Sequence, residues 1–209
     1  IDVNQKKIIQ GMCQQTTNYI KAGQMMDAFE VWDKMLNGDV FPYPNLFHNM
    51  TGLNDYDNYL NTNPPESFEY YAPFLNLPAV QDALHVGSRK FPSNPTQCEL
   101  HLLADFMVSF QEEITVLMDN YKVLLYSGQL DVIIGPALTE AFLYLVPWKG
   151  QARLANATRS VWRINPSDVE VAGYATAVDN FTYVIIRKAG HIAPFDQPAP
   201  CRDMIQRFV

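Results

Sequence analysis

Two titratable side chains in the second half of the sequence, Asp131 and His191, have the types and surroundings that chemistry needs. Each follows a short apolar segment rich in β-forming residues, at residues 121–126 and 181–186, which is typical of a buried parallel strand. Functional groups of open α/β sheets lie just beyond the carboxyl ends of such strands. A glycine shortly before each residue is expected to let the backbone turn sharply.

An aspartate and a histidine in this chain order suit nucleophilic acyl transfer. A serine hydroxyl is a weak nucleophile at neutral pH, so an imidazole must accept its proton. A carboxylate must in turn hold the other ring nitrogen, which selects the correct tautomer. In α/β-hydrolases the chain order is serine, acid, histidine, and Asp131 and His191 match the last two. Either residue alone would as readily be a turn or structural residue, so the prediction depends on the pair.

The elements that must position this pair follow from hydrophobic periodicity and from helix start and stop signals. A long loop is expected over residues 41–73, where no apolar period is sustained. Strands are expected at residues 121–126, 161–164 and 181–186, and helices at residues 2–23, 27–38, 75–86 (beginning at Pro78), 102–120 and 134–145 and from Pro198 onward.

This order predicts an α/β fold with a helical cap segment and long loop at residues 1–73 and core at residues 74–209. Two buried strands are too few for an independent parallel sheet, so further strands are expected from elsewhere. The chain begins at Ile1 and shows no charged-then-apolar leader, and we therefore expect it to be an internal piece of a longer precursor.

Several stretches of the sequence resemble the serine carboxypeptidase family. Tyr-Ser-Gly-Gln-Leu-Asp at residues 126–131 is similar to the motif around the family's catalytic aspartate, Tyr-x-Gly-x-x-Asp. Gly-His-Ile-Ala-Pro-Phe-Asp-Gln-Pro at residues 190–198 is similar to its histidine motif, Gly-His-x-x-Pro-x-Asp-Gln-Pro. Residues 75–86 resemble the family signature Leu-Asn-x-Pro-x-Val-Gln-x-Ala-Leu-His-Val. Shorter likenesses occur at residues 148–150 and 170–174, and the opening helices with residues 39–51 resemble the vitellogenic carboxypeptidase-like branch.

The resemblance implies the C-terminal half of an α/β-hydrolase that removes single residues from peptide C-termini through an acyl-enzyme. Asp131 would orient His191, and His191 would act as general base and general acid. Ile192 would line the pocket for the departing C-terminal residue and favour apolar ones. The chain contains no Gly-x-Ser-x-Gly, so the nucleophilic serine is expected on the N-terminal half of the precursor.

The resemblance also bears on partners. Several family members are cut into two disulfide-linked chains, which would account for the odd number of cysteines, Cys13, Cys98 and Cys201. From the residues alone, free thiols, a bond to another chain and buried inert cysteines all stay open. The expected partners are the N-terminal chain that carries the serine and peptide substrates, with a homodimer left open.

Composition and motifs exclude several other functions. A net charge of −7 argues against nucleic acid or an anionic membrane as the main partner. No run of eighteen apolar residues is present, so no membrane span is expected. Dinucleotide-binding, P-loop and zinc-protease motifs are absent from the sequence, and Cys and His never cluster at metal-ligand spacing, so we expect no cofactor and no metal.

Three glycosylation sequons, at Asn49, Asn156 and Asn180, favour a protein of the secretory pathway, lysosomal or secreted.

Alternative interpretations remain for the candidate residues. The same fold occurs in inactive binding or storage proteins and in acyltransferase or lyase relatives, and an unrelated α/β binding domain would use Asp131 and His191 only structurally.

Asp196 is expected to cap the final helix at Pro198. The remaining histidines, His48, His85 and His101, are expected to be structural.

Overall fold

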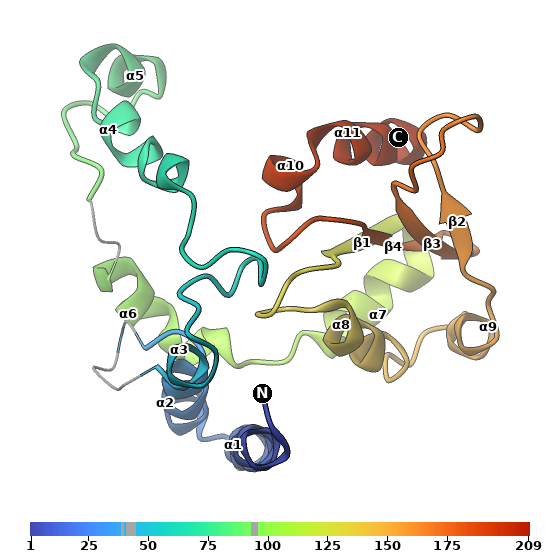
Figure 1. Cartoon of the computed structure of the whole chain (residues 1–209), viewed down its shortest axis with the longest axis horizontal. Helices are drawn as coiled ribbons and strands as arrows, with labels where there is room; N and C mark the ends of the chain where they lie inside the picture. Colours follow the sequence, from blue (N-terminus) through green and yellow to red (C-terminus); the bar gives the residue numbers. More distant parts are fainter. Residues whose placement is uncertain (39, 41–44, 93–95) are drawn as a thin grey trace. The chain divides into compact units, whose positions relative to one another are not determined.

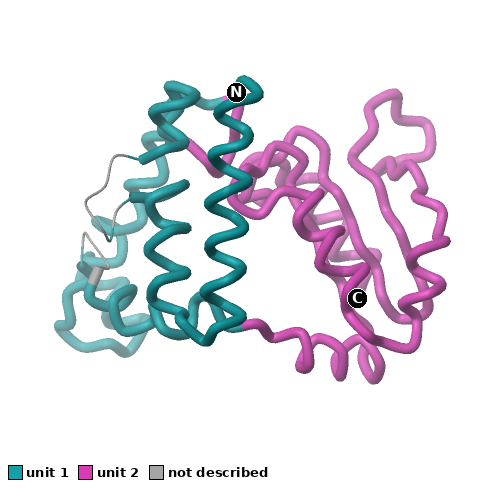
Figure 2. The backbone as a smooth tube through the Cα atoms, turned by 90° about the horizontal axis from the view of Figure 1, so that it is seen from below, with its two compact units in different colours: residues 1–54, 61–108 teal, residues 55–60, 109–209 magenta. Residues whose placement is uncertain are grey.

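The structure is a computed structural model that describes residues 1–38, 40, 45–92 and 96–209. It forms two compact units (Figure 2). Unit 1 comprises Ile1–Asn54 and Asn61–Val108, and unit 2 comprises Asp55–Leu60 and Ser109–Val209. These units divide the chain at positions other than the predicted cap–core boundary after residue 73. Residues 39 and 41–44, which belong to the predicted loop or to the 39–51 likeness, lie outside the described residues.

Unit 1 is helical over its described residues. Its first helix begins at a capping box, in which the Asp2 carboxylate accepts a hydrogen bond from the Gln5 N–H at 2.8 Å and the Gln5 side-chain oxygen accepts one from the Asp2 N–H. Gly23 follows the helix with φ +73°, which stops it as predicted. The elements are α1 (Val3–Lys21), α2 (Met25–Met35), α3 (Leu46–Thr51), η1 (Glu66–Glu69), α4 (Tyr71–Leu75), α5 (Pro78–Ala83) and α6 (Thr96–Phe106).

An aromatic cluster holds α2 against α6. Phe29 is fully buried and meets Phe106 edge to face with 5.2 Å between ring centroids, and Trp32 lies 4.8 Å from Phe106. The predicted loop over residues 41–73 contains α3, η1 and the start of α4. These helices are too short to leave a readable apolar period, which is why the sequence predicted only loop there.

The single helix predicted over residues 102–120 is wrong. The chain instead forms α6 and α7 (Gln111–Asn120), separated by residues 107–110. Leu103 of α6 is buried in unit 1, whereas Met118 of α7 is buried in the core of unit 2. The apolar spacing runs in phase through the break, so periodicity alone could not locate it.

Unit 2 contains a mixed four-stranded sheet in the order β1-β4-β3-β2 (Figure 1). The strands are β1 (Val123–Gly128), β2 (Ser160–Trp162), β3 (Gly173–Val178) and β4 (Phe181–Ile186). β1 and β4 run parallel, and β3 is antiparallel to both β2 and β4. The prediction of β4 is confirmed, and β1 begins two residues later than predicted. β3 was missed because a glycine and two alanines give it little β-propensity.

Helices pack against both faces of the sheet. Side chains alternate along β4, so Phe181 and Tyr183 enter one core cluster while Val184 and Ile186 enter the other. Met118, Leu143 and Leu154 bring α7, α8 (Pro136–Leu143) and α9 (Gln151–Ala155) to the first cluster. Ala193, Cys201 and Met204 bring α10 (Ala193–Asp196) and α11 (Pro198–Phe208) to the second.

None of the helices in the described part of the chain is long and apolar enough to cross a membrane.

Candidate active site

The structure brings Asp131 and His191 into direct contact. The Asp131 Oδ2 atom lies 2.9 Å from the His191 Nδ1 atom. Their strands are neighbours in register, with Gly128 at the end of β1 opposite Ile186 at the end of β4. Because parallel strands end at the same edge of a sheet, the loops that follow them meet there.

Asp131 is held in one orientation by its surroundings. Its side chain is 3% exposed, and its second carboxylate oxygen, Oδ1, accepts a hydrogen bond from the Ile134 N–H at 3.0 Å. An ionised carboxylate can only accept, so the His191 Nδ1 atom must carry the proton in this hydrogen bond. The Nε2 atom of the neutral ring then keeps the lone pair that a general base needs.

The His191 ring is accessible to solvent, and its surroundings raise its basicity. Its side chain is 35% exposed, so the ring reaches the surface of unit 2. The hydrogen bond to Asp131 raises the pKa of His191, and the negative charges of Asp131 and Asp57 act in the same direction, whereas desolvation opposes them. The site therefore favours a ring that takes up a proton readily.

Two glycines allow the loops after β1 and β4 to approach each other and the neighbouring chain closely. A Cβ atom on Gly128 would lie 2.0 Å from the Gly190 carbonyl oxygen, and one on Gly190 would lie 2.2 Å from the Asp57 carbonyl oxygen. Neither glycine has a left-handed backbone, so what each position requires is the absence of a side chain at the close approach. The left-handed residue of this turn is Lys188, with φ +59°.

A further segment, for which no role was predicted, contacts the loops that carry Asp131 and His191. Residues Asp55–Leu60, which we call the strap, belong to unit 2 although the flanking chain belongs to unit 1. The Asp57 carbonyl accepts the His191 backbone N–H at 2.7 Å. On the other loop, Val132 donates to the Tyr56 carbonyl and Tyr59 donates to the Leu130 carbonyl, each at 3.1 Å. The only signal in the sequence was a cluster of turn-forming Asn and Asp residues.

Asp196 does not cap the final helix, and that prediction is wrong. The residue before α11 is Gln197, which makes no side-chain capping hydrogen bond. The Asp196 Oδ2 atom instead accepts from the Gly190 N–H at 2.7 Å and from the Asn58 side-chain amide at 3.0 Å. It thus ties the histidine loop to the strap across 138 residues of sequence.

The other predicted site residues are accessible. Ile192 directly follows the histidine and is 43% exposed. Asn49, Asn156 and Asn180 are all exposed, within α3, after α9 and in the turn between β3 and β4. Their roles in substrate binding and glycosylation stay predictions.

The remaining histidines and the cysteines take no part in the contact between Asp131 and His191. His48 and His101 each place Nδ1 near a local backbone carbonyl, that of Leu53 and that of Gln97. All three cysteines are free in the structure, with Cys13 and Cys98 exposed and Cys201 buried. Within the described ranges, no group of three or more metal-ligating side chains could hold a metal ion.

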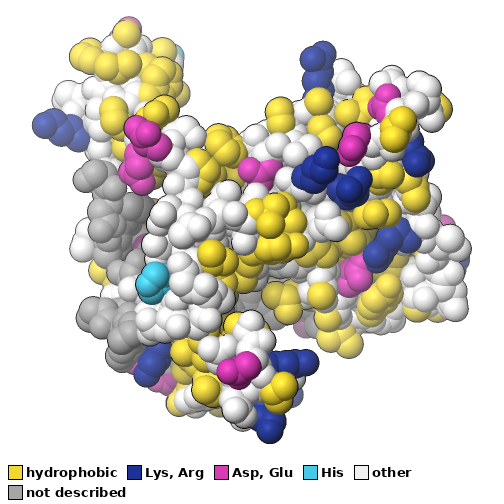
Figure 3. Space-filling view, viewed as in Figure 1, with side chains coloured by type: hydrophobic (Ala, Val, Ile, Leu, Met, Phe, Trp, Pro, Cys, Tyr) yellow, Lys and Arg dark blue, Asp and Glu magenta, His cyan; other side chains and the backbone are white. Residues whose placement is uncertain are grey.

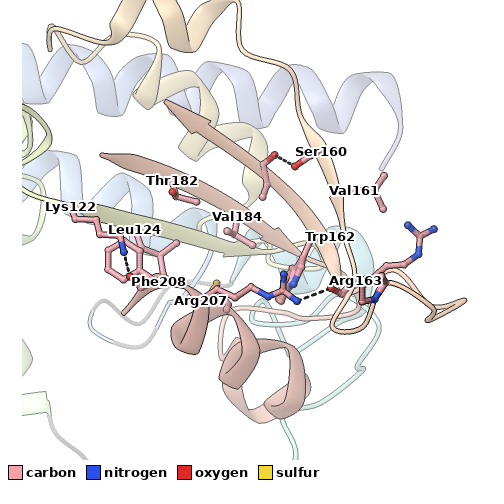
Figure 4. Close-up of a pocket in the computed structure, with 13 residues that line it drawn as sticks. Lys122, Leu124, Ser160, Val161, Trp162, Arg163, Thr182, Val184, Arg207 and Phe208 are labelled. Carbon is pink, nitrogen blue, oxygen red and sulfur yellow. Dashed lines mark hydrogen bonds between the residues drawn. The ribbon is translucent and has the colours of Figure 1, made fainter. Parts of the chain in front are cut away.

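A separate hollow of about 610 Å³ lies on the sheet face beside α11 (Figure 4). Leu124, Val184 and Phe208 give it an apolar lining, with Arg163 and Arg207 among its polar groups. Neither catalytic candidate lines this hollow, so it does not belong to the Asp–His site.

The fold and site together define a class of protein. A hydrogen-bonded aspartate and histidine follow adjacent parallel strands of a sheet with helices on both faces, which is the arrangement of an α/β-hydrolase. The family model "Serine carboxypeptidase" matches residues 1–209. The chain belongs to the serine carboxypeptidase family.

Curated relatives agree with this assignment. The chain is 44% identical over 209 residues to the human "Probable serine carboxypeptidase CPVL" and covers 44% of its length. It is 37% identical over 209 residues to the "Venom serine carboxypeptidase" of Apis mellifera, again covering 44% of that protein. A 32% identity to the "Vitellogenic carboxypeptidase" of Aedes aegypti extends over 165 residues, which are 78% of this chain and 34% of that protein. The chain thus spans less than half the length of these relatives.

A solved structure confirms the predicted fold class. The prohormone-processing carboxypeptidase Kex1(delta)p from Saccharomyces cerevisiae matches all of this chain with a TM-score of 0.67. The sequences are 16% identical, and the match covers 48% of the yeast chain.

Proposed function

We propose that the full-length protein containing this chain is a serine carboxypeptidase in which Asp131 and His191 are the second and third members of the triad. The observation that carries the proposal is the 2.9 Å contact between Asp131 Oδ2 and His191 Nδ1 at the carboxyl ends of β1 and β4. The nucleophilic serine would lie outside these 209 residues, which contain no Gly-x-Ser-x-Gly.

Two features of unit 2 support a contribution from further chain. β1 is at the edge of the described sheet and pairs only with β4, although its residues are those of an interior parallel strand. Hydrophobic side chains also reach the surface (Figure 3), and Leu138 and Leu145 are 61% and 70% exposed. Additional strands and helices would pair with the free edge of β1 and cover these exposed side chains. They would also bring the serine to the open side of His191.

The proposed reaction begins when the serine oxygen attacks the last peptide carbonyl and its proton passes to His191 Nε2. The C–N bond then breaks as His191 returns this proton to the leaving amine, which releases the C-terminal amino acid and leaves an acyl-enzyme. Water next attacks the ester carbonyl and gives a proton to His191. The C–O bond to the serine then breaks as His191 returns this proton to the serine oxygen, which releases the shortened peptide as its carboxylic acid and regenerates the serine. Asp131 stays ionised and stabilises the imidazolium formed in each half-reaction.

Ile192 would select the departing residue. Its exposed aliphatic side chain directly follows His191, which supports a contact with the group that leaves. Loss of apolar contact changes discrimination between substrates by about 10- to 200-fold per methylene-sized difference. We expect Ile192→Ala to lower kcat/KM for a peptide ending in Leu more than for one ending in Ala.

The proposal includes a cellular location and binding partners for the protein. A location in lysosomes or outside the cell would suit the exposed sequons at Asn49, Asn156 and Asn180. The expected partners are peptide substrates and the part of the same precursor that carries the serine.

The test is release of single C-terminal amino acids from N-terminally blocked peptides by purified full-length protein. His191→Ala should lower kcat by about 10,000-fold or more, because the base is gone while the fold is kept. Glu112→Gln, an exposed position on α7, is the matched control and should keep full activity. A folded wild-type protein that releases no amino acid from any blocked peptide would refute the proposal.

A further inference from the structure

The strap makes hydrogen bonds to the loops after β1 and β4, and further hydrogen bonds within itself. The Asp55 carboxylate accepts hydrogen bonds from the backbone N–H groups of Asp57 at 2.8 Å and Asn58 at 3.2 Å. Asp55 is 2% exposed and Asn58 is 9% exposed, so this turn is buried. The strap is thus held by its own hydrogen bonds where it meets the loops after β1 and β4.

Asn58 connects the strap to the histidine loop through its side chain. Its amide donates to Asp196 Oδ2, and the same oxygen accepts the backbone N–H of Gly190, the residue directly before His191. Its own oxygen accepts the Leu60 N–H at 3.1 Å, so both ends of the Asn58 side chain are engaged. Removing the amide would leave the Asp196 carboxylate without one of its two donors in a half-buried site.

Asp57 contributes charge as well as its carbonyl. Its side chain is half-buried, and within the described part of the chain no hydrogen bond to its carboxylate is found. Burial is the main cause that raises the pKa of Asp57, with His191 opposing and Asp55, Asp131 and Asp196 reinforcing. Burial therefore disfavours the ionised form of the Asp57 carboxylate.

We propose that the strap is a positioning element for the catalytic histidine, in which Asn58 holds the His191 loop through Asp196 and the Asp57 carboxylate stabilises the positively charged ring. The proposal rests on the function proposed above. It makes Asp57 and Asn58 positioning residues, since neither is argued to touch the reacting atoms.

Among the described residues, the charged groups that act on the His191 ring are both acidic: Asp131 from the loop after β1 and Asp57 from the strap. Asp196, at the end of α10, and Asp55 act on Asp57 in turn. Asp131 interacts most strongly because it makes the direct hydrogen bond. Asp57 is the remaining carboxylate with an electrostatic effect on the ring, so its removal should be measurable in the titration of His191.

The first experiment compares Asp57→Asn with wild type and Glu112→Gln in the full-length protein. The midpoint of the His191 ring titration, followed by NMR of ¹⁵N-histidine-labelled protein, should move to lower pH in Asp57→Asn and stay unchanged in Glu112→Gln. The melting temperature of Asp57→Asn at neutral pH should be equal to or higher than that of wild type. An unchanged His191 midpoint would overturn the proposal.

The second experiment measures Asn58→Ala. Displacement of a catalytic group by about 1 Å lowers the rate about 100-fold, so kcat should fall by this order with little change in KM. Unchanged kcat in a folded Asn58→Ala protein would also overturn the proposal, and if this variant does not fold, the Asp57→Asn titration decides.

The two proposals fail in different ways. Absence of peptidase activity in folded wild type would refute the carboxypeptidase function, but the shift of the His191 midpoint in Asp57→Asn would still appear. Full wild-type activity together with an unshifted midpoint would refute the role of the strap alone.

Discussion

A single added methyl group at Gly190 tests how closely the strap and the histidine loop must approach. A Cβ atom there would lie 2.2 Å from the Asp57 carbonyl oxygen and 2.7 Å from the Asn58 Cβ atom. Real Cβ contacts essentially never fall below 3.0 Å, and this one would be 2.2 Å. The Gly190 backbone and the Asp57 carbonyl must therefore move apart by at least 0.8 Å. The obstructing atom is a backbone carbonyl that also accepts the His191 N–H, so the movement must displace His191 or break that hydrogen bond.

This displacement gives the expected size of the effect. A shift near 1 Å at a catalytic group lowers kcat by about 100-fold. Overpacking of a close contact destabilises a protein by about 1–3 kcal/mol. Gly190→Ala in the full-length protein should therefore fold with a lower melting temperature and lose most of its peptidase activity at temperatures where it stays folded.

Gly11→Ala is the matched control for this prediction. Gly11 lies within α1, and a Cβ atom there meets nothing within 4 Å, so the substitution should stabilise the protein by about 0.5–1 kcal/mol. Activity is assayed by release of C-terminal amino acids, and stability by thermal unfolding. Unchanged kcat and unchanged stability in Gly190→Ala would refute the reasoning from close approach.

Three further predictions follow from the site and the surface. Asp131→Asn should lower kcat by about 10,000-fold, because an amide can donate to Nδ1 and so favour the wrong tautomer, and a loss of only a few-fold in the peptide assay would contradict this role. The folded-state pKa of His191 is raised, so its contribution to stability is fully present below the ordinary value of about 6.5 and is lost as pH rises through the raised pKa. Chemical denaturation of His191→Gln across this range should therefore show a smaller fall in the free energy of unfolding than wild type, and an identical fall would count against the Asp131 interaction. Protein secreted from eukaryotic cells should lose mass on deglycosylation in steps that disappear with Asn49→Gln, Asn156→Gln and Asn180→Gln, and a mass equal to the bare sequence would exclude glycosylation there.

The contact between Asp131 and His191 was predictable because strong local signals and a general topological rule agreed. The apolar run at residues 181–186 formed β4 as predicted, and the run at residues 121–126 anticipated β1 with a shift of two residues. Adjacent parallel strands end at one edge, which was enough to place Asp131 beside His191. The capping box at Asp2 likewise predicted the start of α1 because its hydrogen bonds are local.

The features that the sequence did not predict depend on contacts between distant residues. The strap lies against loops that are far from it in sequence, and no local pattern in Asn58 indicates a hydrogen bond to Asp196. Asp196 stands beside a proline-started helix, so local reasoning predicted a cap rather than a partner for Gly190. β3 has weak intrinsic propensity and is a strand because β2 and β4 flank it.

The central claim is that Asp131 and His191 activate a serine supplied by the rest of the full-length protein. Its most direct test is covalent labelling of that protein with a fluorophosphonate probe, followed by mass spectrometry of the labelled peptide. The label should attach to a serine outside residues 1–209, and the rate of labelling should collapse in His191→Ala while Glu112→Gln labels normally. Labelling at an unchanged rate in His191→Ala, or no labelling of folded wild-type protein, would contradict the account.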